Sequence, residues 1–131
     1  MADLTEAQAR RWIDAYKAAW EKGDADLAAS LFHEDALYRE RPFTAPIQGR
    51  DAVHKYWSRR VTDYQEDVIF DYNFWSVKGN ECYYQWQAAF TWLPINGRLE
   101  LDGVCKLTFS LVDDDMPVCQ IFEEWFDLRE L

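Results

Sequence analysis

The chain has 131 residues, the usual length of one domain, and its 49% hydrophobic and 17% aromatic content suffices for a core without disulfides or a structural metal. Its formal net charge is −10, and a field of that sign repels nucleic acids and anionic membranes, which we therefore exclude as partners. Neither a signal-like apolar segment nor an apolar run of membrane-spanning length is present, so we expect one cytoplasmic domain over residues 1–131.

The N-terminal segment predicts an amphipathic helix. Thr5 and Gln8 have the spacing of a capping box, and Gly23 is placed to end the helix. Between them, apolar side chains recur every three or four residues, which is the spacing of one helix face. This stripe consists of Trp12, Ala15, Tyr16, Ala19 and Trp20.

Two further helices and a strand are expected next. Asp24 can cap a short second helix that carries Phe32 on its inner face. A strand over residues 35–40 then leads into a loop over residues 41–46. The third helix is expected from residue 51 to about residue 61, directly after a glycine.

The second half of the chain alternates between apolar and polar residues, which predicts strands. Asn96-Gly97 predicts a hairpin, and Gly103 in mid-strand suggests a bulge or bend that curls the sheet. Helices followed by an antiparallel sheet indicate an α+β fold. The expected strands cover residues 67–77, 82–92, 99–109 and 118–128.

The three cysteines are odd in number, widely spaced and set in apolar runs. Cys82, Cys105 and Cys119 therefore indicate reduced, buried thiols rather than a disulfide framework or a zinc site. With only two histidines in the chain, and no phosphate-binding glycine motif, we expect neither a metal nor a cofactor.

Several short motifs follow one another along nearly the whole chain. They are Ala19-Trp20-Glu-Lys-Gly-Asp24, Leu31-Phe-His-Glu-Asp-Ala36, Pro42-Phe-Thr-Ala-Pro-Ile-Gln-Gly49 with Tyr56-Trp57, Leu101-Asp-Gly-Val104 followed by Phe109, and Glu124-Trp125. In this order and spacing they resemble the nuclear transport factor 2-like superfamily, most closely its SnoaL-like polyketide cyclase and ketosteroid isomerase branch. The resemblance implies a cone-shaped α+β barrel, with three N-terminal helices on a curved, mostly antiparallel sheet. It also implies a pocket between the first helix and the concave face.

The resemblance further implies candidate catalytic residues. Tyr16 stands where the isomerases place an oxyanion-binding tyrosine, and Glu40 stands where they place a general-base aspartate. Their third residue, a protonated aspartate, falls on Cys105, or on Lys106 if the alignment shifts by one residue. Because a thiol donates a hydrogen bond poorly, this position departs from the isomerases. The cyclases, which use a carboxylate base in a hydrophobic pocket without a metal, fit better.

Each candidate also has a purely structural interpretation. Tyr16 can be a core tyrosine, and Glu40 lies in a charged run where it can pair with an arginine in solvent. Asp102 alternates with the apolar residues Leu101 and Cys105 along its expected strand, so we expect its side chain to point to the opposite face, away from the pocket. The tryptophans together exceed what a core of this size needs, which indicates that some line a cavity. The expected pocket residues are Trp12, Trp20, Trp57, Trp86 and Cys105.

Two functions are compatible with this pattern. The first is a cofactor-independent isomerase, cyclase or lyase that acts on a small apolar or aromatic molecule, with Glu40 as base and Tyr16 as electrophile. The second is a non-catalytic binding or dimerisation module with the same pocket. Sheet-to-sheet dimers are frequent in the family that the chain resembles, so we expect a homodimer. Its contact face would carry Tyr83, Gln85, Gln87 and Thr91.

Overall fold

In the computed structural model, which describes residues 3–40, 42–110 and 116–131, one sheet has the strand order β2-β1-β6-β5-β4-β3. All neighbouring strands are antiparallel except β1 and β6, which are parallel. The helices are α1 (Glu6–Lys22), α2 (Ala25–Ser30) and α3 (Arg50–Trp57), and α3 continues as the π-helical turn η1 (Ser58–Thr62). The strands are β1 (Phe32–Arg39), β2 (Ile47–Gln48), β3 (Gln65–Lys78), β4 (Glu81–Trp92), β5 (Gly97–Ser110) and β6 (Val118–Glu130), with a short 3-10 turn η2 (Leu93–Ile95) between β4 and β5.

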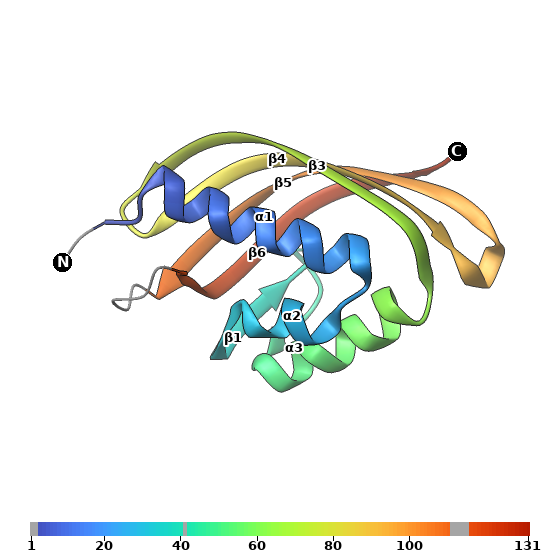
Figure 1. Ribbon diagram of the computed structural model, residues 1–131, viewed down its shortest axis with the longest axis horizontal. Coiled ribbons are helices and arrows are strands. Elements are labelled where there is room, and N and C mark those ends of the chain that lie inside the picture. Colours follow the sequence, from blue (N-terminus) through green and yellow to red (C-terminus); the bar gives the residue numbers. More distant parts are fainter. Residues whose placement is uncertain (1–2, 41, 111–115) are drawn as a thin grey trace.

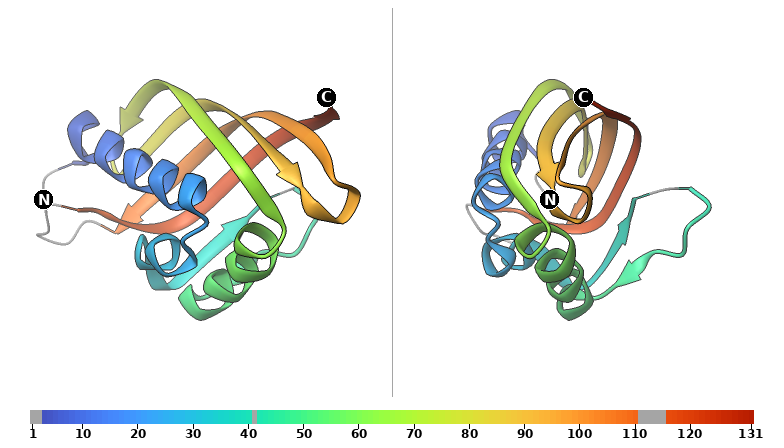
Figure 2. Two further views of the ribbon diagram at one scale, coloured as in Figure 1. Left: turned by 45° about the vertical axis from the view of Figure 1, so that its right-hand side comes forward. Right: turned by 90° about the vertical axis from the view of Figure 1, so that its right-hand side faces the viewer.

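The long strands β3 to β6 curve, and α1 and α3 lie on the open side of the curve (Figures 1 and 2). The expected α+β class is confirmed, with three helices and a six-stranded, mostly antiparallel sheet. The cone shape that the resemblance implies stays a prediction. Because α1 crosses the concave face, its apolar stripe meets the inward side chains of the strands.

The helix signals in the sequence are confirmed in detail. Thr5 and Gln8 form the complete capping box of α1, and Gly23 ends the helix in the left-handed conformation at φ 65°. The Asp24 carboxylate accepts a hydrogen bond from the Leu27 N–H at 3.0 Å and so caps α2. These local bonds fix where the first two helices begin and end.

The structure corrects two expectations in this region. Phe32 does not belong to the second helix, because α2 ends at Ser30 and Phe32 begins β1, paired in parallel with Cys119 of β6. The strand therefore starts three residues earlier than expected. The loop after β1 is present from residue 42 onward, residue 41 lying outside the described part, and it leads into the short strand β2, which the sequence did not predict.

The core is built around aromatic rings from α1. The Tyr16 ring stacks on Trp12 at a centroid distance of 5.4 Å and meets Trp57 and Phe70 edge-on at 5.4 and 5.8 Å. Trp20, one helical turn later, reaches Trp86 on β4 at 5.8 Å. Each such pair contributes roughly 0.5–1.5 kcal/mol beyond the area that it buries. The aromatic residues thus hold α1 on the sheet.

Gly103 serves a different purpose from the expected bulge. Its pairing with Trp86 and Phe126 is regular, and the irregularity between β5 and β6 lies instead between Thr108 and Phe109. A Cβ atom at position 103 would lie 2.7 Å from the Phe126 Cβ and still closer to a backbone oxygen of β6. The missing side chain also lets the rings of Trp86 and Phe126 meet across β5 at 5.9 Å.

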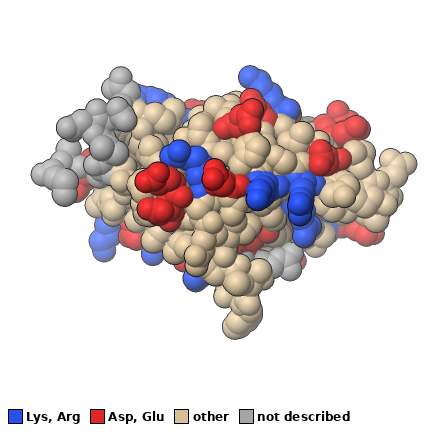
Figure 3. Space-filling view, turned by 90° about the horizontal axis from the view of Figure 1, so that it is seen from below, with Lys and Arg blue, Asp and Glu red and all other residues tan. Residues whose placement is uncertain are grey.

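The three cysteines are free and buried, as expected, and burial raises the pKa of the Cys82 thiol to about 12. Among the described residues, no helix combines the length and the apolar character needed to cross a membrane. The face that carries α2, α3 and β1 in Figure 1 shows acidic and basic side chains interspersed, without a continuous field of one sign (Figure 3).

Replacing Gly103 by alanine is expected to lower the free energy of unfolding by about 1–3 kcal/mol, because the new methyl group would push against the backbone of β6. Urea denaturation of the purified variant measures this change. Gly97→Ala is the matched control, because its Cβ would meet only a flexible isoleucine side chain, at 3.3 Å. Equal stability of the two variants would contradict the close approach at Gly103.

Candidate functional site

A cavity of about 290 Å³ opens between α1, α3, η1 and the concave face of the sheet. Aromatic rings form most of its wall, and two carboxyl groups, an arginine and a glutamine are its polar members apart from tyrosine hydroxyls and tryptophan N–H groups. Its volume lies near the lower end of the 300–1,000 Å³ that is usual for small-molecule pockets. The described residues that line it are Tyr16, Trp20, Tyr38, Glu40, Tyr56, Trp57, Arg60, Val61, Gln65, Trp86, Phe90, Trp92, Leu99, Leu101, Glu124, Phe126 and Leu128.

The two carboxyl groups are brought together by the parallel pairing of β1 with β6. Tyr38 is paired with Phe122, and their rings stack at 4.5 Å with an interplanar angle of 2°. Glu40 and Glu124 each follow two residues later along these strands, so both have the parity of the stacked pair and point to the same side. Both line the cavity.

Glu40 is half-buried and is held from the helical side of the cavity. The Tyr56 hydroxyl, from α3, donates a hydrogen bond to Glu40 Oε1. Burial and the nearby Glu40 charge raise the pKa of Tyr56, so this hydroxyl keeps its proton and remains a donor. Glu40 thus lines the cavity. The alternative drawn from the sequence, in which Glu40 extends into solvent and pairs there with an arginine, does not describe this position.

Glu124 lies deeper, with only 5% of its surface exposed, and is the one buried charged residue in the described part of the chain. Burial, and secondarily the charge of Glu40, raise its pKa well above the ordinary value of 4.5. The carboxyl group is therefore held in its protonated form over a pH range in which exposed glutamates are ionised.

Two tyrosine hydroxyls complete the polar floor of the cavity. Tyr16 and Tyr38 are each only 3% exposed, and burial raises the pKa of both well above the usual value. The nearby Glu124 carboxyl group raises the pKa of both tyrosines further, while hydrogen bonding with Tyr38 acts in the opposite direction on the pKa of Tyr16. Both hydroxyls are consequently neutral donors beside the carboxyl pair.

Arg60 and Gln65 lie on another side, at the turn from η1 into β3. The Arg60 side chain is exposed while it lines the cavity, which places it at the mouth, and its guanidinium lies 5.9 Å from the centre of the Tyr56 ring. Gln65 accepts a hydrogen bond from the Trp20 indole N–H at 2.7 Å. Both residues carry N–H groups that can donate to a bound molecule.

Most of the site residues expected from the sequence meet at this cavity. Tyr16, Glu40, Trp20, Trp57 and Trp86 all line it. The structure therefore gathers the two candidate catalytic residues and three of the expected pocket tryptophans in one place.

Trp12 and Cys105 do not line the cavity. Trp12 lies one helical turn before Tyr16 and is fully buried against Phe32 and Phe109, and its indole N–H donates to the Leu31 carbonyl at 2.8 Å. Cys105 is buried beside Tyr84, and burial raises the pKa of its thiol well above the usual value. Lys106, the alternative for this position, points to the other face of the sheet and pairs with Glu81 at 3.3 Å. Asp102 is exposed, as expected.

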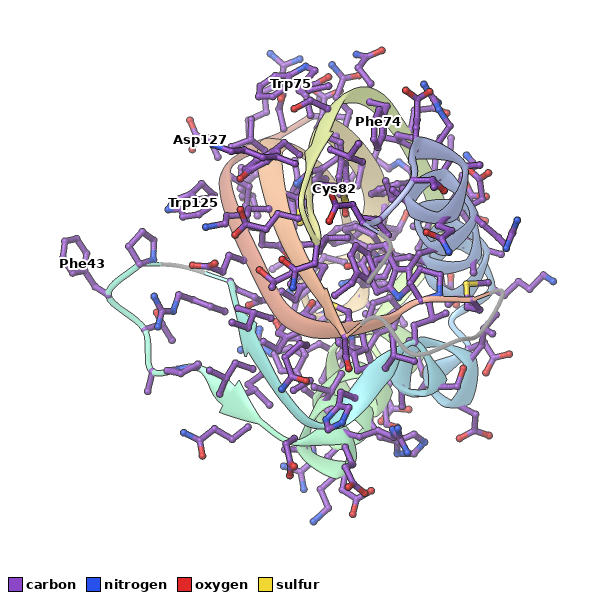
Figure 4. The ribbon with its side chains drawn as sticks, turned by 90° about the vertical axis from the view of Figure 1, so that its left-hand side faces the viewer. Phe43, Phe74, Trp75, Cys82, Trp125 and Asp127 are labelled. Carbon is purple, nitrogen blue, oxygen red and sulfur yellow. The ribbon has the colours of Figure 1, made fainter. Side chains whose placement is uncertain are left out.

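The sequence interpretation did not assign a role to Glu124. Its signal is the alternation in β6, where Phe122, Glu124 and Phe126 share one face. Trp125 and Asp127, which alternate with them along the strand, point away from the body of the protein (Figure 4). A glutamate in phase with two inward phenylalanines indicates a buried carboxyl group, but its partner Glu40 is far away in the sequence.

Comparison with solved structures gives neighbours of the same fold. A LEH-like epoxide hydrolase from Mycobacterium tuberculosis is 19% identical, with a TM-score of 0.66. The alignment covers 92% of this chain and 83% of the hydrolase chain. The epoxide hydrolase/cyclase-like enzyme SalBIII, involved in pyran ring formation in the polyether salinomycin, is 18% identical with a TM-score of 0.76 and coverages of 93% and 95%. The hexachlorocyclohexane dehydrochlorinase LinA type 2 is 10% identical with a TM-score of 0.79 and coverages of 95% and 87%. At these identities the likeness shows the fold alone.

No curated protein sequence matches the chain. The model of the SnoaL-like domain, however, matches residues 9–115, which include α1, the β1–β2 region, α3 and strands β3 to β5. This match confirms the resemblance drawn from the short motifs. The chain belongs to the SnoaL-like domain family, within the nuclear transport factor 2-like superfamily.

Proposed function

We propose that the cavity is the active site of a cofactor-independent enzyme that performs acid–base chemistry on a small, largely apolar ring compound. The reaction class is an isomerisation, cyclisation or elimination that begins with proton transfer at a carbon or oxygen atom. The observation that carries this proposal is the pair of carboxyl groups in different environments within one aromatic cavity.

The two carboxyl groups suit different roles. Glu40, half-buried and bonded to the Tyr56 hydroxyl, acts as the base that removes a proton. Glu124, whose pKa is raised by burial, stays protonated and donates to the oxygen atom on which negative charge develops. Tyr16 and Tyr38 supply further neutral hydroxyl donors beside it.

Glu124 also supplies what the sequence lacked at Cys105. The isomerases that the chain resembles use a protonated carboxyl group on the penultimate strand, where this chain has the thiol. Glu124 lies on the neighbouring strand β6 and is paired with Cys105 in the sheet. A buried acid is thus available on the adjacent strand, and we propose that it takes over the donor role.

The wall and size of the cavity support a ring-shaped substrate. Trp20, Trp57, Trp86, Phe90 and Trp92 offer flat apolar surfaces, against which a ring stacks and buries its area. The volume of about 290 Å³ admits a compound of one or two fused rings. The neighbours of this fold include a dehydrochlorinase, an epoxide hydrolase and a cyclase-like enzyme, which shows that the fold can support this kind of chemistry.

A second candidate is a binding module without catalysis. Tyr16 favours it, because its ring is packed among Trp12, Trp57 and Phe70 and is only 3% exposed, as in an ordinary core residue. Native mass spectrometry of the purified protein would reveal a retained small molecule. Turnover by the wild-type protein and its loss in the carboxyl variants separate the two functions.

Glu40→Gln is expected to slow proton abstraction by roughly 10²–10⁴-fold, because the amide cannot accept the proton. Deuterium exchange next to the carbonyl group of 2-tetralone, a two-ring ketone, measures this step in D₂O by NMR. Quenching of tryptophan fluorescence checks that the variant still binds the ketone. Exchange by the variant at the wild-type rate would rule out Glu40 as the base.

Glu124 is expected to make the stability of the protein decrease as the pH rises. Its pKa is 4.5 in the unfolded chain and well above that in the fold, so between these values the folded state keeps a proton that the unfolded state has lost. The free energy of unfolding should therefore fall from about pH 5 upward, by about 1.4 kcal/mol per pH unit until the folded group ionises.

Urea denaturation over a pH series tests this dependence in the wild type and in Glu124→Gln, which should show a flatter profile. Glu123→Gln is the matched control, because Glu123 is the neighbouring residue of β6 and lies on the outer face. Parallel profiles for the wild type and Glu124→Gln would contradict the burial of a proton at this position.

The homodimer and the cytoplasmic location stay predictions. The outer side of the sheet carries Trp75 and Trp125, which are 59% and 40% exposed and point outward in Figure 4. Light scattering of the purified protein measures the oligomeric state directly. A mass equal to one chain at micromolar concentration would contradict the dimer.

A further inference from the structure

Arg60 and Gln65 bring N–H donors to the cavity from the segment where η1 leads into β3. Glu124 belongs to β6 and Glu40 directly follows β1, whereas Gln65 begins β3, which the strands β5 and β4 separate from β6. Arg60 precedes Gln65 at the mouth, on η1. The cavity therefore has its two carboxyl groups at β1 and β6, an amide donor at β3, and a guanidinium at its mouth beside the tyrosine that binds Glu40.

The orientation of the Gln65 amide is fixed by its neighbour. The Trp20 indole N–H can only donate, so the amide oxygen has to face it, as the 2.7 Å contact shows. The amide NH₂ group is then directed elsewhere, and none of the described residues accepts a hydrogen bond from it. Gln65 thus presents a donor whose orientation does not depend on a ligand.

The Arg60 guanidinium is likewise without an acidic partner in the described part of the chain. Its contact is with the face of the Tyr56 ring, which leaves its N–H groups available in the plane of the guanidinium. It is also the one cationic side chain among the described residues that line the cavity. A planar guanidinium binds a carboxylate through two parallel hydrogen bonds.

We propose that Arg60 and Gln65 form a carboxylate-binding subsite, and that the ligand of the cavity is a one- or two-ring aromatic or alicyclic acid. The ring would lie between the tryptophans, the carboxylate would bind Arg60 and Gln65 at the mouth, and the reacting end would face Glu40 and Glu124. This inference rests on the proposed function for the location of the site, but its test measures binding and needs no turnover.

The positive charge of Arg60 at the mouth would also offset the repulsion between an anionic ligand and this acidic protein. The chain carries a net charge of −10 and the cavity holds Glu40, so an anion without a specific partner would be repelled. The alternative role of Arg60 is to balance the charge of Glu40 across the Tyr56 ring. In that case Arg60 would affect charged and uncharged ligands alike, whereas a subsite distinguishes between them.

The test compares 2-naphthoate with 2-naphthamide, which have the same shape and differ in charge, by calorimetry and tryptophan fluorescence. The wild type should bind the acid about tenfold more tightly than the amide, as a hydrogen-bonded charge would provide. Arg60→Gln should remove this preference, because it weakens the binding of 2-naphthoate about tenfold more than the binding of 2-naphthamide. Arg59→Gln, the matched control, removes the same charge from the preceding residue, which does not line the cavity, and should preserve the preference.

A second variant separates charge from geometry. Gln65→Glu keeps an acceptor for the Trp20 indole and replaces the amide donor with an anion, so it should bind 2-naphthoate at least tenfold more weakly. The inference is wrong if the wild type binds both probes equally, if Arg60→Gln and Arg59→Gln behave alike, or if 2-naphthoate does not bind at millimolar concentration.

Failure of the proposed function would look different. Suppose that Glu40→Gln exchanged deuterium at the wild-type rate while the preference for 2-naphthoate still depended on Arg60. The acid–base mechanism would then be wrong, and the carboxylate-binding subsite would be supported. Deuterium exchange that depended on Glu40, with no preference for the acid, would give the opposite result and indicate a neutral substrate.

Discussion

The parallel pairing of β1 with β6 is the constraint on which the site depends. It stacks Tyr38 on Phe122 and so sets the register in which Glu40 and Glu124 follow on the same face. A shift by one residue would turn one of the two carboxyl groups away from the cavity, because successive side chains of a strand point to opposite faces. The stacked pair thus sets the register that brings the two carboxyl groups to one cavity.

The burial of Glu124 carries a cost that the surrounding structure offsets. An ionised carboxylate in an apolar core is strongly unfavourable, and the group responds by retaining its proton. The fold tolerates the buried acid because the aromatic rings of α1 and the sheet supply a large and well-packed apolar interior. The same rings form the walls of the cavity, so one set of residues provides both the stability and the surface for a ligand.

The shape of the cavity also depends on Gly103, which has no side chain. At Gly103 the missing side chain allows β6 to approach β5 closely and allows Trp86 to meet Phe126 over the glycine. Both rings belong to the cavity wall. A residue with no side chain therefore shapes the site as much as the bulky residues around it, by deciding how close two strands can lie.

Much of the fold follows from local patterns in the sequence. The capping box of Thr5 and Gln8, the cap at Asp24 and the left-handed Gly23 depend on neighbouring residues, so they could be predicted. The end of α2 could not, because Phe32 joins a strand only through its pairing with Cys119 of β6. In the same way, Trp12 and Trp20 belong to one apolar stripe, yet only Trp20 reaches the cavity, since position along α1 decides which part of the sheet each one meets.

By itself, the sequence determined the fold class, the helix boundaries at Thr5, Gly23 and Asp24, and the candidates Tyr16 and Glu40, because these depend on periodicity, capping and the order of short motifs. Only the tertiary structure decided that Glu124 lines the same cavity as Glu40, that Cys105 lies outside the cavity, and that Arg60 and Gln65 also line it. The physical reason is that these relations depend on the pairing of distant strands and on the curvature of the sheet, which no local pattern encodes.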